Sequence, residues 1–469
     1  MELFPKPSAN TRLGFHYYPD TLHYRESDLN AWLPELHALG ATWVTLVAPH
    51  DRAIPEFFIR GLIAAGIEPI LHFHLPLEQH AQINDLRLLF ETYARWGIHY
   101  VVLFDRPNLR TSWPATAWAQ SNLVERFLDV YLPLAQAALQ TGLIPVFPPL
   151  EPGGDYWDTA FLRGALQGIQ RRGHHLLLER LVLGAYAWVG NRSLNWGAGG
   201  PERWPGARPY QTPQGSQDQR GFRIFDWYLT QVRAVGDIPC AILLLGAGCR
   251  PGDQTDPSLP PVDRSAHAKT NLSITALLNG KPTLSAKHKN MIDLEGIEEV
   301  PPEVLACNFW ILAAAPGSPS AAQAWFQPDG NTLPIVGALR QWVAGQEGQP
   351  EPVPTQVPQA AIPHGISVAV AANDPIQRNG HSIQHYLLLP TYEWGIADWH
   401  LDVIRPFVKK YRPTIGFSLK EASQAARVTV IGGAQSFPEA VLVELRSANC
   451  KVEQISGDGT SIASQLATL

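Results

Sequence analysis

The sequence has 469 residues, of which 45% are hydrophobic and 17% are charged, a composition typical of a globular protein with room for more than one domain. The formal net charge is -6 at pH 7, which argues against a nucleic-acid partner because binding to phosphate backbones requires clustered positive charge. No run of about 18 apolar residues occurs, so the sequence predicts no membrane span.

The N-terminus and the cysteines bear on the compartment and on metal binding. Residues 1–11 lack the apolar core of a signal peptide, so the sequence as written predicts a cytoplasmic protein, or an extracellular one if the start codon is wrongly assigned. The four cysteines are widely spaced and form no Cys-x-x-Cys pair, which favours neither a structural zinc site nor a disulfide framework. We therefore expect no metal and no cofactor.

The first 343 residues repeat a pattern of about 25 to 30 residues, in which an apolar run precedes an amphipathic segment and a glycine. The apolar runs predict strands over 13–20, 42–48, 68–75, 101–104, 144–150, 181–188, 239–245 and 305–313. The amphipathic segments predict helices over 27–39, 54–65, 84–96, 123–140, 161–170, 222–235, 267–278 and 338–343. Eight such units predict an α/β fold, a (β/α)8 TIM barrel over residues 1–343.

Polar and aromatic side chains cluster at the C-terminal ends of these strands, which face the active site in barrel enzymes. The candidate substrate-binding residues are His16, His72, His74, Arg106, Asn108, Tyr186, Trp188 and Trp310. Asp105 and Glu151 follow adjacent strands and could form a carboxylate pair, so they are the candidate catalytic residues. The alternative is that Asp105 pairs with Arg106 or another arginine as part of the scaffold. The long loop 189–221 follows a strand end, and we expect it to cover this site.

The barrel resembles the glycoside hydrolase superfamily over nearly its whole length. The matching points are Gly14-Phe15-His16-Tyr17, Asp105-Arg106-Pro107-Asn108, Tyr186, Trp188, Gly246-Ala247-Gly248 and Trp310. In that superfamily the fourth strand commonly ends in Asn-Glu-Pro, where the Glu is the general acid/base, and the seventh strand ends in a run similar to Thr-Glu-Gly. Here Arg106 occupies the first of these places, and Gly246-Ala247-Gly248 occupies the second.

These departures affect the activity that the resemblance implies. A retaining glycosidase needs two carboxyl groups about 5 Å apart, and an arginine stays protonated at any working pH. We therefore expect a barrel that recognises an oligo- or polysaccharide after the loss of standard retaining hydrolysis, with Arg106 able to bind an acidic sugar. One alternative is an active glycosidase that uses Asp105 and Glu151. Another is a metal-dependent hydrolase that uses His16, His72 and His74, although the fifth and sixth strands offer no further histidine ligands.

A second region follows a proline-rich linker over 344–363, and it spans residues 364–469. The predicted strands are 365–371, 385–389, 427–431 and 450–455, and the predicted helices are 398–411, 418–426, 438–448 and 461–469. Ser418-Leu419-Lys420-Glu421 is a capping box that opens one of these helices. Strands alternating with helices predict a small α/β domain with a parallel sheet.

Part of this second region resembles the cell-wall-binding repeat family of bacterial surface proteins. The resemblance covers Val428 to Gly433, Val452 to Gly457 and Ile462-Ala463, which match one repeat of a strand, Gly-Gly, a helix, a strand and a helix. It implies a cell-wall polymer as a partner. The sequence departs from the family at Asp458-Gly459-Thr460, where the repeat carries Asp-Arg-Tyr. A generic βαβ unit is the alternative.

Overall fold

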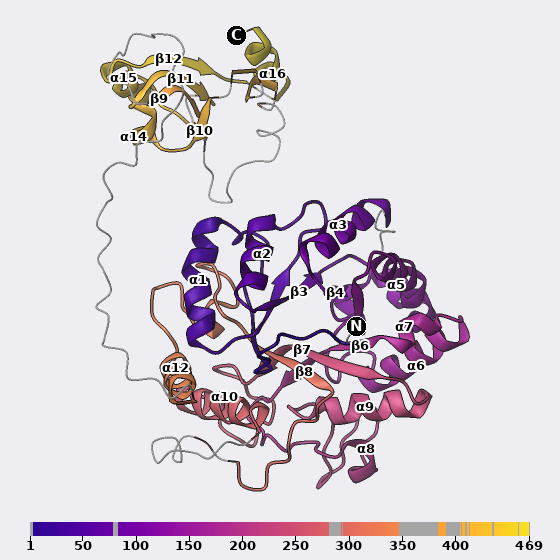
Figure 1. Cartoon of the computed structure of the whole chain (residues 1–469). Coiled ribbons are helices and arrows are strands. Elements are labelled where there is room, and N and C mark those ends of the chain that lie inside the picture. The colour runs from indigo at the N-terminus through magenta and orange to yellow at the C-terminus, as the bar shows by residue number, and fades with distance from the viewer. Residues whose placement is uncertain are drawn as a thin grey trace. The chain divides into compact units, whose positions relative to one another are not determined.

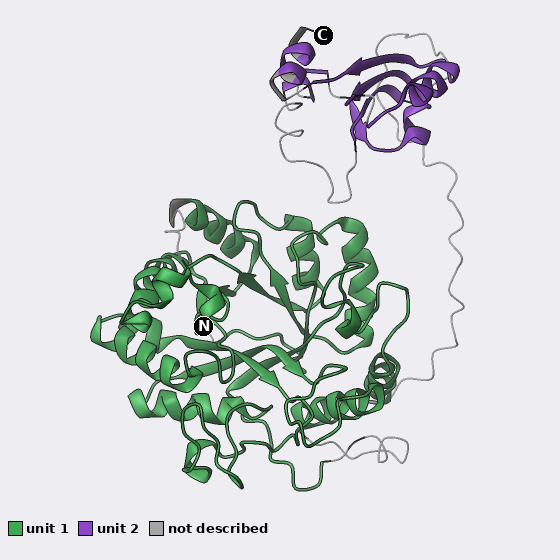
Figure 2. Cartoon of the chain, turned by 180° about the vertical axis from the view of Figure 1, so that it is seen from behind, with its two compact units in different colours: residues 1–355 green, residues 356–469 purple. Residues whose placement is uncertain are grey.

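The structure, a computed structural model, divides the chain into two compact units, residues 1–355 and 356–469 (Figures 1 and 2). It describes residues 3–77, 83–280, 292, 294–346, 383–390, 404, 406–408, 410–411, 413–433, 436–457 and 459–468. The division between the units falls inside the predicted linker 344–363. The last helix of unit 1 continues to Gln346, and the rest of the predicted linker lies outside the described residues.

Unit 1 is a closed barrel of eight parallel strands in the order β1 to β8. The strands are β1 Leu13–His16, β2 Trp43–Val47, β3 Glu68–Phe73, β4 Tyr100–Leu103, β5 Ile144–Phe147, β6 Leu181–Trp188, β7 Cys240–Gly248 and β8 Val304–Phe309. The barrel closes where β8 pairs with β1, with Gly14 opposite Asn308. A side chain at Gly14 would overlap Asn308 and Trp43, so only glycine fits at this closure. The predicted (β/α)8 barrel is confirmed.

Helices surround the barrel (Figure 1). The long ones are α1 Glu26–Ala38, α2 Glu56–Ala64, α3 Ile83–Trp96, α5 Leu123–Gln140, α6 Asp158–Arg171, α9 Ile224–Val235, α10 Arg264–Leu278 and α12 Pro334–Gln346. Short helical turns lie in the loops, at η1 Arg110–Ser112, α4 Ala115–Trp118, α7 His175–Glu179, α8 Gly200–Arg203 and η2 Ala321–Gln323. Among the described helices, none is both long and apolar enough to cross a bilayer.

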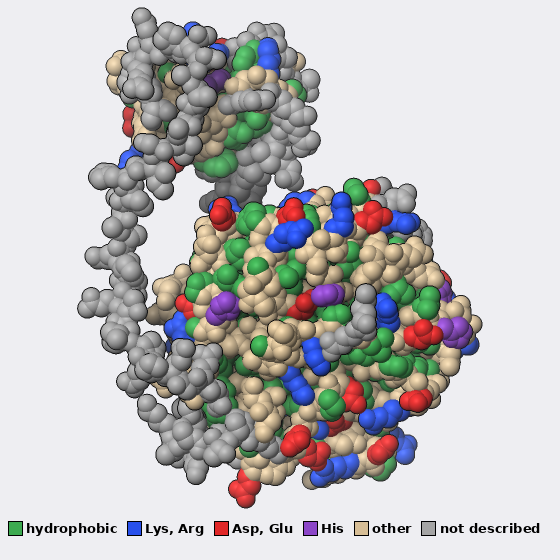
Figure 3. All heavy atoms as spheres, in the orientation of Figure 1, with side chains coloured by type: hydrophobic (Ala, Val, Ile, Leu, Met, Phe, Trp, Pro, Cys, Tyr) green, Lys and Arg blue, Asp and Glu red, His purple; other side chains and the backbone are tan. Residues whose placement is uncertain are grey.

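The inside of the barrel is filled by side chains from the strands, as in other barrels of this size. Trp43, Ile70, Tyr100, Val146 and Leu243 belong to one buried cluster contributed by five different strands. The helices pack a second, larger apolar cluster against the outer face of the strands, where α5 buries one side along its whole length. On the face of unit 1 visible in Figure 3, acidic and basic side chains are interspersed.

Several strand ends differ from the prediction, among them those of β1, β7 and β8; β3 and β5 also end earlier than predicted, at Phe73 and Phe147. β1 stops at His16 instead of Asp20, three residues before Pro19, which has no N–H to donate to a ladder. β8 stops at Phe309, so Trp310 lies just after the strand and not within it. β7 continues to Gly248 because it stays paired with β6 as far as Trp188, beyond an irregularity between Ala185 and Tyr186.

Unit 2 contains a four-stranded parallel sheet in the order β10-β9-β11-β12. Its elements are β9 Ile383–Leu388, β10 Thr414–Gly416, α14 Leu419–Ala422, β11 Ala425–Ile431, α15 Glu439–Ser447, β12 Lys451–Ile455 and α16 Gly459–Thr468. Alternate residues of β9 and β11 enter two separate apolar clusters, as expected for a sheet covered on both faces. This confirms the predicted α/β domain with a parallel sheet.

The predicted helix 418–426 is wrong in length. Ser418 does cap it, since its hydroxyl accepts a hydrogen bond from the Glu421 backbone N–H, but the helix ends at Ala422. Ala425 is already buried in β11, where pairing with Ile383 outweighs local helix propensity. The predicted strand 365–371 and most of the predicted helix 398–411 lie outside the described residues. The resemblance to cell-wall-binding repeats stays a prediction.

Candidate functional site

Three charged side chains meet at the C-terminal ends of β4 and β5. The Arg106 Nε donates a 2.8 Å hydrogen bond to Asp105 Oδ2, and Arg106 Nη1 lies 3.7 Å from Glu151 Oε2. The Arg106 backbone N–H also bonds to the Pro149 carbonyl at 3.0 Å, which ties the two strand ends together. One guanidinium therefore contacts both of the candidate catalytic carboxylates.

The backbone at this strand end adopts an unusual conformation. Phe104 has a φ of 72° and Arg106 a φ of 44°, in the left-handed region that side chains larger than glycine rarely occupy. Such residues cost free energy and occur most often where function requires a particular placement of side chains. The strained turn aims Arg106 at the carboxylates instead of along the strand direction.

Asp105 and Glu151 differ in their protonation. Burial acts to raise the pKa of Asp105, but the charge of Arg106 and the hydrogen bond from Tyr186 act against it, and the net shift is downward. Burial raises the pKa of Glu151, against the opposing charges of Arg106 and Arg250. Asp105 is thus held ionised, while Glu151 keeps its proton to a higher pH than an exposed glutamate does.

Two of the three histidines lie inside the barrel. The His72 Nε2 lies 2.9 Å from the Phe104 carbonyl and must carry the proton to donate to it, which leaves the buried Nδ1 as an unpartnered acceptor. Burial lowers the pKa of His72 to about 3 and that of His16 well below its usual value, so both rings are neutral. His74 is exposed, and its ring centre lies 4.3 Å from that of His72.

The histidines were also the candidate ligands of a metal site. Within the described residues, no three His, Cys, Asp or Glu side chains are arranged to hold a metal ion. The geometry therefore does not favour the metal-dependent hydrolase that was the alternative for His16, His72 and His74.

Aromatic side chains form a wall beside the charged residues. Tyr186 stacks on Trp188 with ring centres 5.2 Å apart and an interplanar angle of 13°. Trp188 meets Trp310 edge to face at 5.9 Å, and Trp310 lies 4.6 Å from the His16 ring. Trp188 and Trp310 are both half-buried, so part of each indole stays open to a ligand. Indole faces suit the apolar faces of flat or ring-shaped ligands.

Arg250 is a site residue that the sequence interpretation missed. Its guanidinium lies 4.4 Å above the Trp188 ring and is fixed by a 3.0 Å hydrogen bond to Asp253. The sequence could have indicated Arg250 as a site residue, because it lies two residues after the end of β7, on the same edge of the barrel as the other site residues. Arg250 adds a second positive charge next to Glu151.

Asn108 does not take part as predicted. Its side chain is fully buried, donates to the Glu151 and Tyr156 carbonyls at 2.9 and 3.0 Å, and accepts from the Glu151 backbone N–H at 2.8 Å. The amide has no group left for a ligand, which corrects the expectation that Asn108 binds substrate. It holds in place the backbone that carries Glu151.

The long loop 189–221 is ordered around one buried carboxylate. Asp218 accepts hydrogen bonds from Trp196, Thr212 and Arg220 and pairs with Arg192. Further along the loop, the Tyr210 hydroxyl accepts from the Trp157 backbone N–H next to α6. The Asp218 contacts hold the loop together, the Tyr210 contact joins it to the residue before α6, and its covering of the mouth stays a prediction.

No family model and no curated protein matches the chain. Similar solved structures include a family 39 glycoside hydrolase from Bacteroides cellulosilyticus WH2, at 10% identity and a TM-score of 0.42, over 72% of this chain and 65% of that one. A second is a family 128 endo-β-1,3-glucanase from Sorangium cellulosum, at 12% identity and a TM-score of 0.38, over 70% of this chain and 96% of that one. A third is a β-galactosidase from Marinomonas ef1, at 10% identity and a TM-score of 0.40, over 96% of this chain and 76% of that one. The chain spans just under two thirds of the first structure. A barrel shared at this identity is compatible with many activities, so the function has to follow from the site.

Proposed function

We propose that the mouth of the barrel binds a carbohydrate and lacks standard retaining hydrolysis. The observation that carries the proposal is the Arg106 guanidinium in contact with both Asp105 and Glu151. A guanidinium cannot exchange a proton at neutral pH, so Arg106 cannot serve as the acid/base of a glycosidase. The end of β7 at Gly246-Ala247-Gly248 offers no carboxylate that could act as a nucleophile.

The surroundings of these charges support sugar binding. A pyranose ring has apolar faces and hydroxyls at its edge, and it needs an aromatic surface beside hydrogen-bonding groups. Trp188 and Trp310 supply the aromatic surface. Arg106 and Glu151, at 43% and 32% exposure, supply donors and acceptors that a bound sugar can reach, and His74 adds an exposed imidazole.

The charges at the mouth favour an acidic sugar. Arg106 Nη1 is 3.7 Å from Glu151, longer than a hydrogen bond, so this nitrogen can still donate to an incoming carboxylate. The raised pKa of Glu151 weakens its repulsion of a second anion. Arg250 adds positive charge over the Trp188 ring. We infer that a uronic acid residue fits this arrangement better than a neutral hexose.

A binding assay run beside a turnover assay tests the proposal. The ligands are acidic and neutral oligosaccharides, and the substrates are aryl glycosides and polysaccharides of the same sugars. We expect acidic oligosaccharides to bind the wild type without turnover. Arg106→Ala and Trp188→Ala should each weaken binding roughly tenfold or more, because each removes a charge-assisted hydrogen bond or a stacking surface.

Trp118→Ala is the matched control, since Trp118 lies in the short helix α4, packs against the outer apolar cluster and makes no ring contact with the described residues of the site. Circular dichroism confirms that each variant is folded. Turnover that disappears in Glu151→Gln would contradict the absence of hydrolysis and identify Glu151 as a catalytic residue. Equal binding by wild type and Arg106→Ala would contradict the recognition of an acidic sugar.

A further inference from the structure

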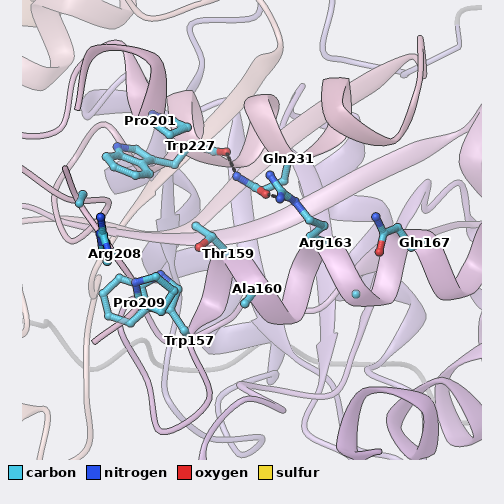
Figure 4. A pocket seen from close by; sticks show the side chains of 12 residues that line it. Trp157, Thr159, Ala160, Arg163, Gln167, Pro201, Arg208, Pro209, Trp227 and Gln231 are labelled. Carbon is cyan, nitrogen blue, oxygen red and sulfur yellow. Dashed lines mark hydrogen bonds between the residues drawn. The ribbon is translucent and has the colours of Figure 1, made fainter. Parts of the chain in front are cut away.

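A cavity of about 410 Å³ lies on the outer wall of the barrel, between α6, α9 and the segment 201–209 (Figure 4). Its lining includes Trp157, Arg163, Gln167, Arg208, Trp227 and Gln231. None of the residues at the barrel mouth lines it. A volume of this size is within the range of small-molecule sites.

The charge of the lining is entirely positive, since two arginines and no aspartate or glutamate contribute to it. The Arg163 Nε donates to Gln231 Oε1 at 2.8 Å, while its terminal nitrogens bond to no described residue. The side chain of Arg208 likewise makes no hydrogen bond or ion pair to the described part of the chain; its backbone pairs with Gln211. Both guanidiniums can therefore bind an anion without breaking an existing ion pair.

Asp158, which lies between the lining residues Trp157 and Thr159, has hydrogen-bond partners outside the cavity. Asp158 is fully buried and accepts hydrogen bonds from Gly153, Gln219 and Tyr228. None of these three donors lines the cavity, and Asp158 forms no ion pair with Arg163 or Arg208. The residues that line the cavity therefore carry positive charge only, which favours a small anion as the ligand.

The walls of the cavity are apolar and already in place. Trp157 and Trp227 both line the cavity, and each is 5% exposed. The Trp227 Nε1 donates to the Gly197 carbonyl at 2.8 Å, which fixes the ring. Figure 4 shows the two indoles on the side of Pro201 and Pro209, with Arg163 and Gln231 on the helices. A preformed wall lowers the entropy cost of binding.

We propose that this cavity is a second binding site, for an acidic sugar of one or two rings. The ring packs against Trp157 and Trp227, and a carboxylate of the sugar accepts hydrogen bonds from Arg163 or from Arg208, which lie on opposite sides of Thr159 (Figure 4). Gln167 places amide groups beside the ring hydroxyls. That the ligand is a sugar rests on the function proposed for the mouth, whereas the preference for an anion follows from the cavity alone.

Equilibrium dialysis of the full chain tests the proposal with glucuronic acid and its disaccharide, against glucose, cellobiose and inorganic phosphate. Arg163→Gln/Arg208→Gln removes both charges while keeping polar side chains of similar reach. The matched control is Arg60→Gln/Arg87→Gln, which makes the same charge change at two exposed positions, where Arg60 pairs with Glu56 on α2 and Arg87 pairs with Glu91 on α3. Thermal unfolding confirms that the variants are folded.

We expect the uronates to occupy two sites on the wild type, one of which weakens roughly tenfold or more in Arg163→Gln/Arg208→Gln and stays intact in Arg106→Ala. If the mouth binds no sugar, the cavity site alone remains in both the wild type and Arg106→Ala. Unchanged uronate binding in Arg163→Gln/Arg208→Gln would overturn the proposal. Equal binding of glucose would overturn the preference for an anion, and equal competition by phosphate would overturn recognition of the sugar ring.

Discussion

The Tyr186 hydroxyl donates a 2.7 Å hydrogen bond to Asp105 Oδ1, and this bond joins the end of β6 to the end of β4. The other oxygen of Asp105 accepts from Arg106, so both oxygens have a donor. A carboxylate at 14% exposure can stay ionised only with such partners. Tyr186 in turn stacks on Trp188, and the aromatic wall is thereby fixed to the charged residues.

Tyr186→Phe removes this hydroxyl and keeps the ring. Asp105 then loses one of its two donors in a nearly buried place, and we expect the free energy of unfolding at pH 7 to fall by about 1 to 3 kcal/mol. Urea denaturation measures the change. Tyr17→Phe is the control, because the Tyr17 hydroxyl is buried without a partner among the described residues, and its removal should leave stability equal or higher. An equal loss in both variants would show that the hydrogen bond contributes nothing of its own.

Arg250→Gln tests the guanidinium above Trp188. Removing it takes away a cation–π contact and a charge next to Glu151, and we expect acidic oligosaccharides to bind several-fold more weakly. Arg203→Gln is the matched control, since Arg203 lies 5.9 Å from the Trp204 ring at an exposed position outside the mouth. Dialysis with an acidic and a neutral oligosaccharide measures both variants. A loss of affinity that is the same for both sugars would assign Arg250 to holding Trp188 in place and not to the charge of the ligand.

The sequence was sufficient to predict the barrel because its strands are short apolar runs closed by turn residues, a pattern that does not depend on distant contacts. It also predicted that Asp105, Arg106, Glu151 and Tyr186 would meet, since the ends of parallel strands share one edge. It could not predict which side chain turns toward which. Asn108 faces inward because the backbone around Glu151 offers it three hydrogen-bond partners, and that backbone is fixed only by the fold.

Long-range pairing accounts for the other differences. Ala425 belongs to a strand because Ile383, more than forty positions earlier in the printed sequence, pairs with it, whereas its immediate neighbours favour a helix. The cavity beside Trp227 likewise depends on α6, α9 and the loop 201–209 meeting in space. None of these contacts leaves a periodic signal in the sequence.

The two units should unfold independently. Each has its own apolar clusters, those of unit 1 within the barrel and those of unit 2 on the two faces of its sheet. We expect a fragment ending at residue 355 to keep the thermal midpoint of the barrel in the full chain, and a fragment of residues 356–469 to unfold cooperatively. Calorimetry of the two fragments and the full chain measures this. A midpoint for the barrel fragment more than a few degrees below that in the full chain would show that the units stabilise each other.

The buried carboxylate of Asp158 should make stability depend on pH. Burial raises the pKa of Asp158 to about 6, although Gly153, Gln219 and Tyr228 donate hydrogen bonds that oppose the shift. In the unfolded chain an aspartate has a pKa of about 3.9, so between these values the folded state binds more protons than the unfolded state. The contribution of Asp158 to the free energy of unfolding is therefore greatest below pH 4 and declines as the pH rises through 6, by up to roughly 3 kcal/mol.

Asp158→Asn is neutral at every pH and isolates this contribution. We expect the free energy of unfolding of the variant, relative to that of the wild type, to increase between pH 4 and pH 7. The altered hydrogen bonds change the stability of the variant by the same amount at both pH values and do not affect this increase. Urea denaturation at both pH values measures the difference, in which the other titrating groups cancel. Asp329→Asn is a control of opposite sign, because hydrogen bonds from Asn331 lower the pKa of Asp329 and its contribution is lost as the pH falls. A relative stability of Asp158→Asn that does not change with pH would show that Asp158 has the same pKa in the folded and unfolded states, and that its three donors offset the cost of burial.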